Sequence, residues 1–150
     1  MKLFKGKKIQ TIALSFVLML TFVLGTGIAA YADTTEITSD MHIRSHQYNS
    51  YSANSSTRKT TKSNNAWRVD LTKSSEAQGT VTSFWLVKSS ATGTGLSKKI
   101  DVKKGSGWND CIPYADANSA SGIGVKIAAE NNTWNTETYD ITCKWVAQAS

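Results

Sequence analysis

The stretch Tyr139-Asp-Ile-Thr-Cys-Lys-Trp145 alternates strictly between apolar and polar side chains, and this alternation decides the fold class. Successive side chains of a β-strand point to opposite faces, so all the apolar members of this stretch fall on one face. The other face carries Asp140, Thr142 and Lys144, which suit water. A strand with one buried and one wet face is typical of antiparallel sheets.

Other segments repeat the pattern. Residues 67–72 and 123–129 alternate in the same way, and a short strand is expected at 100–102. Residues 80–87 become apolar on both faces toward their end, which predicts a central strand covered from both sides. Turn-forming residues separate the runs, and no helix of three turns is expected after residue 32. The sequence therefore predicts an all-β fold, an antiparallel β-sandwich or a small barrel.

The N-terminus has the features of an export signal. An apolar run from Ile12 to Leu24 ends near the small-x-small tripeptide Ala30-Tyr-Ala32, and is preceded by Lys2, Lys5, Lys7 and Lys8. This arrangement predicts a cleaved signal peptide at residues 1–32 and a secreted protein. A retained membrane anchor is the alternative, but the thirteen-residue core is shorter than the roughly 18–20 residues that span a bilayer. No stable membrane span is expected after cleavage.

Charge and length then describe the remaining 118 residues. The whole chain has a net charge of +6, but residues 33–150 hold thirteen Lys and Arg against eleven Asp and Glu, a net charge of +2. Most of the excess basicity is discarded with the signal, so a nucleic-acid partner is not expected. The length suits one domain. Its polar segment 33–65 is predicted as a loop or edge strand, and 66–150 as the β-sandwich core.

Two cysteines, Cys111 and Cys143, are the next feature. In an exported chain such a pair most often forms one disulfide, so we expect a bond between them. A free thiol pair and an intermolecular bridge are the alternatives.

Metal and catalytic signals are weak. His42 and His46 are the only histidines, and with Asp40 they do not complete the four ligands of a structural zinc site. We interpret them as solvated side chains and expect neither metal nor cofactor. No base accompanies a serine or cysteine nucleophile, and no spacing selects a pair of carboxylates. The sequence therefore predicts a protein that is not an enzyme.

The five tryptophans divide by position. Trp67, Trp85 and Trp145 lie on alternating strands and are expected in the core. Trp108 and Trp134 lie in turns rich in Gly and Asn, where an exposed indole can stack on a sugar or rest at a lipid interface. The alternative is that these two indoles fold back as plugs over an open end of the sandwich.

Basic residues form two groups, which are candidates for a surface that binds anionic wall polymers or anionic lipid. The alternative is a set of solvated lysines that discourage aggregation between sheet edges. The residues are Arg58, Lys59, Lys62, Lys98, Lys99, Lys103 and Lys104.

Three stretches carry a family resemblance: Asn65-Ala-Trp-Arg-Val-Asp-Leu71, Gly79-Thr-Val-Thr-Ser-Phe-Trp-Leu86 and Val125-Lys-Ile-Ala-Ala-Glu-Asn-Asn132. Over about residues 40–146 the chain resembles a group of small secreted proteins of Gram-positive bacteria, catalogued as a domain of unknown function. The resemblance implies export and a β-rich fold, and no activity or site. The paired cysteines depart from the pattern of that group. Residues 41–56, followed by Trp-bearing strands, also resemble the shorter lactococcin 972-type bacteriocins.

These features together predict a secreted, non-enzymatic β-domain that binds the cell wall or the cell surface. A bacteriocin-like antibacterial protein is the alternative. The sequence leaves the oligomeric state open.

Overall fold

The computed structural model describes residues 35–60, 62–76, 79–116 and 119–149, so the predicted signal peptide lies outside the described residues. Within these ranges no helix is long and apolar enough to cross a membrane. The described chain forms strands β1 (Ile37–Ile43), β2 (Ser50–Tyr51), β3 (Ser56–Thr57), β4 (Trp67–Ser74), β5 (Val81–Lys88), β6 (Ala91–Gly95), β7 (Ile100–Lys103), β8 (Asn109–Cys111), β9 (Gly124–Asn131) and β10 (Tyr139–Val146).

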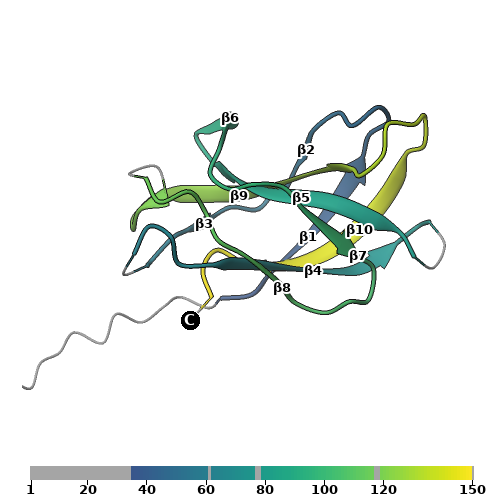
Figure 1. The fold of residues 1–150 in the computed structure, drawn as a ribbon. Helices are drawn as coiled ribbons and strands as arrows, with labels where there is room; N and C mark the ends of the chain where they lie inside the picture. Colours follow the sequence, from purple (N-terminus) through teal and green to yellow (C-terminus); the bar gives the residue numbers. More distant parts are fainter. Residues whose placement is uncertain (1–34, 61, 77–78, 117–118, 150) are drawn as a thin grey trace, which may run out of the picture. The chain divides into compact units, whose positions relative to one another are not determined.

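The strands form two antiparallel sheets. Sheet A has the order β1-β10-β4-β8, and sheet B has the order β2-β9-β5-β6, with β3 also paired to β9 and β7 to β5. Figure 1 shows the two layers, with β5 and β9 in the upper layer and β4 and β8 in the lower. The prediction of an antiparallel all-β sandwich is confirmed.

The alternating stretches face the core as predicted. On β10 the apolar side chains are buried, and Trp145 and Cys143 are fully so. Trp67 and Leu71 of β4 and Phe84 of β5 pack into the same core. Each fully buried aliphatic or Phe side chain contributes about 1.5–3 kcal/mol to folding. The inward faces of both sheets therefore supply most of the stabilisation.

The described residues of the polar segment 33–65 form more regular structure than their composition indicates. β1 forms the edge of sheet A along β10, in a register that places Ile43 opposite Tyr139. β2 and β3 are short and both pair with β9 in sheet B. The expected edge strand is therefore β1, which buries Met41 and Ile43.

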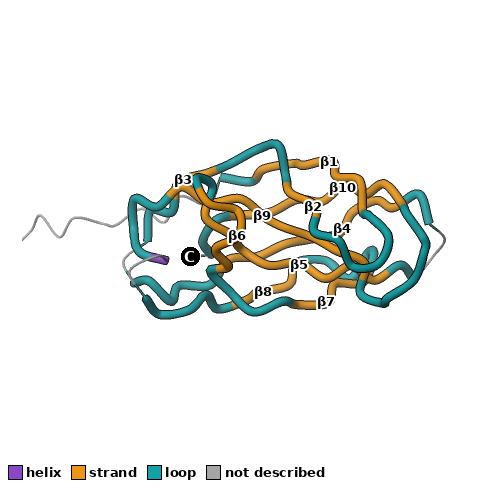
Figure 2. Tube along the Cα trace, turned by 90° about the horizontal axis from the view of Figure 1, so that it is seen from above, coloured by secondary structure: helices purple, strands orange, loops and turns teal. Residues whose placement is uncertain are grey.

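Strand register gathers the loops at the two ends of the sandwich, as Figure 2 shows in teal. Ile43, Ser74 and Tyr139 lie at one end of sheet A, and Val81 and Asn131 lie at the same end of sheet B. The β1–β2, β4–β5 and β9–β10 connections therefore meet there. We call this end the loop end.

Arg58 closes the opposite end, and the structure corrects its predicted place on a basic surface. Its side chain is fully buried, and its guanidinium donates to the carbonyl oxygens of Ser119, Ala147, Ser63 and Asn65. Burial lowers the pKa of Arg58 to about 10, so the guanidinium stays charged at neutral pH. Its planar fork of five N–H donors suits this task, because it satisfies carbonyls from several loops at once.

The predicted disulfide is wrong. Cys111 and Cys143 are both buried and unbonded. Cys111 lies on β8 and Cys143 on β10, the two strands that flank β4. Cys111 pairs with Trp67 of β4, and Cys143 pairs with Leu71, four residues further along β4. Strand spacing and rise then place their Cα atoms about 16 Å apart, whereas a disulfide needs about 4.4–6.8 Å. The sequence shows two cysteines in one domain, but the distance between them depends on the strand order, which the sequence does not reveal.

Replacement of Arg58 by Met should destabilise the protein, because several buried carbonyl groups lose their donor. We expect the free energy of unfolding to fall by about 2–4 kcal/mol in urea denaturation. The exposed Lys62 provides the control, since Lys62→Met should leave the midpoint nearly unchanged. Equal stability of Arg58→Met and the unchanged protein would contradict this role.

Titration of thiols tests the separated cysteines. Burial raises the pKa of both thiols, that of Cys143 to about 12, so neither should react readily with a disulfide reagent in the native state at pH 8. In guanidinium without reductant, two thiols per chain should react. No reactive thiol under that condition would show a disulfide and contradict the strand order.

Candidate functional site

Exposed large apolar side chains point to the site, because such side chains are usually buried. Among the described residues they fall into two groups. The first lies on the β1–β2 segment and the β9–β10 loop: Tyr48, Tyr51 and Trp134. The second lies on β8 and its flanks: Trp108, Ile112 and Tyr114. Trp134 is the most exposed, at 70 %.

The β1–β2 loop is held in an unusual conformation. His46 and Gln47 both have a φ of 55°, in the left-handed region that side chains other than glycine rarely adopt. The backbone N–H of His46 donates to the carbonyl of Asn135 at 2.7 Å, and the Gln47 side chain donates to the carbonyl of Asn132 at 3.3 Å. Strain of this kind persists where surrounding contacts hold it, and it concentrates at functional sites.

The same contacts bring aromatic rings together. The His46 ring meets the Trp134 indole edge-on, with centroids 5.2 Å apart, and lies 6.3 Å from the Tyr48 ring. The Arg44 guanidinium lies over the Tyr48 ring at 5.3 Å. These four side chains, Arg44, His46, Tyr48 and Trp134, form the aromatic cluster of the loop end.

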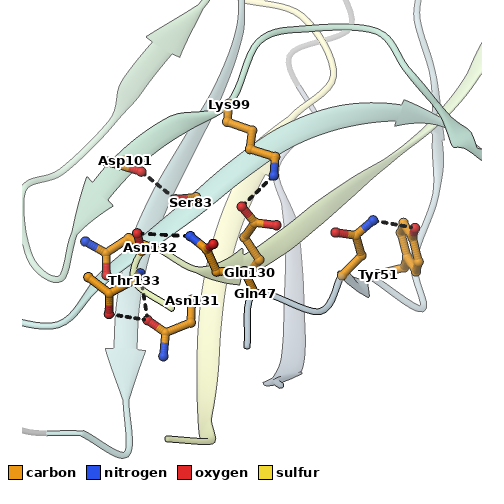
Figure 3. A network of polar contacts seen from close by, with 10 residues as sticks. Gln47, Tyr51, Ser83, Lys99, Asp101, Glu130, Asn131, Asn132 and Thr133 are labelled. Atoms are coloured by element: carbon orange, nitrogen blue, oxygen red, sulfur yellow. Dashed lines mark hydrogen bonds and ion pairs between the residues drawn. The ribbon is translucent and has the colours of Figure 1, made fainter. Parts of the chain in front are cut away.

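Side-chain amides fix the loop that carries Trp134. Asn131 donates to the amide oxygen of Asn135 at 2.8 Å, and Asn135 donates to the Thr133 hydroxyl at 3.0 Å. The backbone N–H of Thr133 donates back to the Asn131 amide oxygen at 3.2 Å, which closes the ring of contacts. Figure 3 shows Asn131 and Thr133 beside the Gln47–Asn132 contact. The exposed indole is therefore carried by a tightly bonded turn.

A polar cleft of about 470 Å³ adjoins this turn. Its described lining includes Glu76, Thr80, Asn131, Asn132, Thr133 and Asn135. Among these described residues Glu76 is the one with a charge, so amides and hydroxyls supply most of the hydrogen-bonding groups. A cleft of this composition, lined by the residues on either side of Trp134, can hold a polar, uncharged ligand.

The outer face of sheet B continues from the loop end. Glu130 is buried, and its carboxylate accepts from Lys99 Nζ at 2.5 Å. The same ammonium lies 4.7 Å from the centroid of the Trp85 ring. Figure 3 shows this pair beside the Ser83–Asp101 hydrogen bond. Trp85, expected in the core, is buried in a separate small cluster with Val87 and Ala128.

The other predicted site residues lie elsewhere. Trp108 is 40 % exposed, and the Arg68 guanidinium lies 5.9 Å from its ring centroid. Among the predicted basic residues, Lys104 donates to the Ser74 carbonyl and Lys99 is paired with Glu130. The exposed members are Lys59, Lys62, Lys98, Lys99 and Lys103. Arg58 is buried at the end opposite the loop end, whereas Lys103 pairs with Val81 and Lys104 contacts Ser74 at the loop end, so the predicted basic residues do not form one surface.

The two histidines also take separate places. His42 Nδ1 lies 2.8 Å from Asp140 across the β1–β10 pair, where a groove of about 460 Å³ runs along the outer face of sheet A. His46 packs against Trp134 instead. Among the described residues no group of three or more His, Cys, Asp and Glu side chains is placed to hold a metal ion.

Comparison of the chain with protein-family models, curated proteins and solved structures yields no match. The resemblances to secreted Gram-positive proteins and to lactococcin 972-type bacteriocins therefore stay predictions. The candidate site is therefore identified from the geometry of this structure alone.

The sequence indicated Trp134 as a candidate ligand contact, but it did not indicate the side chains that surround Trp134. Arg44, His46 and Tyr48 lie in a polar segment whose composition resembles an unstructured loop. Their position depends on hydrogen bonds to residues almost ninety positions further along the chain. The available signal was the density of His, Tyr and Arg in one short stretch, which is unusual for a simple linker.

Replacement of Lys99 by Met should destabilise the fold, because the buried Glu130 carboxylate loses its cationic partner. We expect a loss of about 1–3 kcal/mol in the free energy of unfolding. Lys103→Met, at an exposed position of β7, is the matched control and should have little effect. If both variants lose the same stability, the Lys99–Glu130 pair has no special role.

Proposed function

We propose that the protein is a secreted, non-enzymatic binding module that attaches to the glycan strands of the cell wall through Trp134 and the adjoining polar cleft. The observation that carries the proposal is an indole that is 70 % exposed and yet held by a bonded turn. Such exposure loses hydrophobic stabilisation unless a ligand covers the ring.

The chemistry of the cleft supports a sugar ligand. The C–H face of a pyranose packs on an indole, and the edge of the indole keeps a polar N–H for hydrogen bonding. Asn132 and Thr133 line the cleft at partly or fully exposed positions and suit hydroxyl and acetamido groups. A rigid platform also binds with a smaller loss of side-chain entropy than a mobile one.

Charge favours the neutral part of the wall over its anionic polymers. Arg58 is buried, and Lys99 is compensated by Glu130, so two members of the predicted basic surface are not free to bind phosphate. Arg44 is the cation within the aromatic cluster, beside Tyr48. Anionic polymers and anionic lipid are therefore the alternatives that an experiment must separate.

We further propose that binding is not accompanied by hydrolysis. Glycoside hydrolysis most often uses two carboxyl groups on either side of the bond. The described lining of the cleft holds one, Glu76.

Cosedimentation of the purified protein with peptidoglycan sacculi stripped of anionic polymers tests the function. The protein should pellet with the sacculi at low and at high salt. Trp134→Ala should weaken binding at least about tenfold, a loss of about 1.4 kcal/mol. Trp108→Ala, the other exposed tryptophan, should bind like the unchanged protein.

Two further probes separate the alternatives: untreated walls that keep their anionic polymers, and vesicles of phosphatidylglycerol. Binding that needs these anionic surfaces and disappears at high salt would contradict the proposal, because screening removes exposed charge interactions. Failure to pellet with stripped sacculi would also overturn it.

A further inference from the structure

A second exposed aromatic side chain lies on the outer face of sheet B, apart from the aromatic cluster. Tyr51 of β2 pairs with Ala128 of β9, and Ala128 pairs with Trp85 of β5. These three positions form one row across the sheet. Because Trp85 and Ala128 are buried while Tyr51 is 37 % exposed, the phenol stands at the open side of the row.

We propose that Tyr51 forms a second subsite, so that the ligand is an extended glycan chain running from Trp134 to Tyr51. The proposal rests on the proposed function and deepens it. It specifies a polymer of several sugar units in place of a single terminal sugar.

Exposed side chains connect the two aromatic residues: Tyr48 lies beside His46 of the aromatic cluster, and Asn49 donates to the Tyr51 hydroxyl. Ala128 and Glu130 on β9 are buried beneath this route, and Tyr51 lies opposite Ala128. Ala128 and Asn131, at the end of β9, are about 10 Å apart along the strand. This span exceeds one sugar ring, so a ligand that reaches both aromatic residues must have several units.

The groups along this path suit hydroxyls. Figure 3 shows Tyr51 on one side of the Lys99–Glu130 pair, with the Gln47–Asn132 contact on the other side. The Tyr51 hydroxyl accepts from the Asn49 side chain at 3.2 Å, which orients the phenol. Asp101 accepts from Ser83 at the far edge.

Charge along the path favours an uncharged chain. Lys99 and the buried Glu130 compensate each other at 2.5 Å, so this pair adds no net charge. A polyanion would meet Lys99, whose charge is already compensated. A neutral glycan can instead contact hydrogen-bonding groups beside the Tyr51 ring.

Calorimetric titration with the di- and hexasaccharides of β-1,4-linked N-acetylglucosamine tests the second subsite. The unchanged protein should bind the hexasaccharide about tenfold more tightly than the disaccharide, because the second contact forms within one complex. Tyr51→Ala should remove most of this advantage and leave disaccharide binding unchanged. Trp134→Ala should weaken both.

Tyr114→Ala is the matched control, since Tyr114 is a similarly exposed tyrosine near β8. It should change neither affinity, and circular dichroism should show that every variant is folded. Equal affinity of the unchanged protein for both sugars would overturn the second subsite and leave the proposed function standing. So would a Tyr51→Ala variant that keeps the length advantage or weakens both sugars equally. If neither sugar binds the unchanged protein, the second subsite and the proposed glycan specificity both fail.

Discussion

The antiparallel register of β1 against β10 is the constraint on which the site depends. By pairing Ile43 with Tyr139, it starts the β1–β2 loop beside the end of the β9–β10 loop. The N–H of His46 then reaches the carbonyl of Asn135, and the His46 ring meets Trp134. A shift by one residue would turn Met41 and Ile43 away from the core, so burial of these side chains fixes the register. Core packing thereby positions an exposed aromatic cluster.

The fold was predictable wherever side chains alternate. The period of two in 139–145 and 67–72 gave the buried faces of β10 and β4 correctly, since burial of alternate side chains is a local property of a strand. Arg58 shows the limit, because its partners come from loops near residues 63, 119 and 147. The cysteines show it again: the cysteine pair and the predicted export signal favour a bond, but strand order decides the distance between the two residues.

For the site, the sequence indicated Trp134 as a candidate exposed indole but could not show which residues surround it. Trp134 stands out as a bulky apolar residue in a polar turn, and that signal is local. The left-handed conformation at His46 and Gln47 is not local, because contacts to the β9–β10 loop hold it. Trp85 is buried as expected, but the sequence could not show that it lies in a small cluster apart from the main core, since an apolar residue on a central strand can face either side.

The central claim is that glycan contacts the loop end and the outer face of sheet B. Amide and indole N–H signals in a two-dimensional NMR spectrum report this directly, since the five tryptophans give separate indole resonances. On addition of the N-acetylglucosamine hexasaccharide, we predict shifts at the Trp134 indole and along residues 46–51 and 128–135. Shifts confined to Trp108 and β8, or no shifts at saturating sugar, would contradict the account.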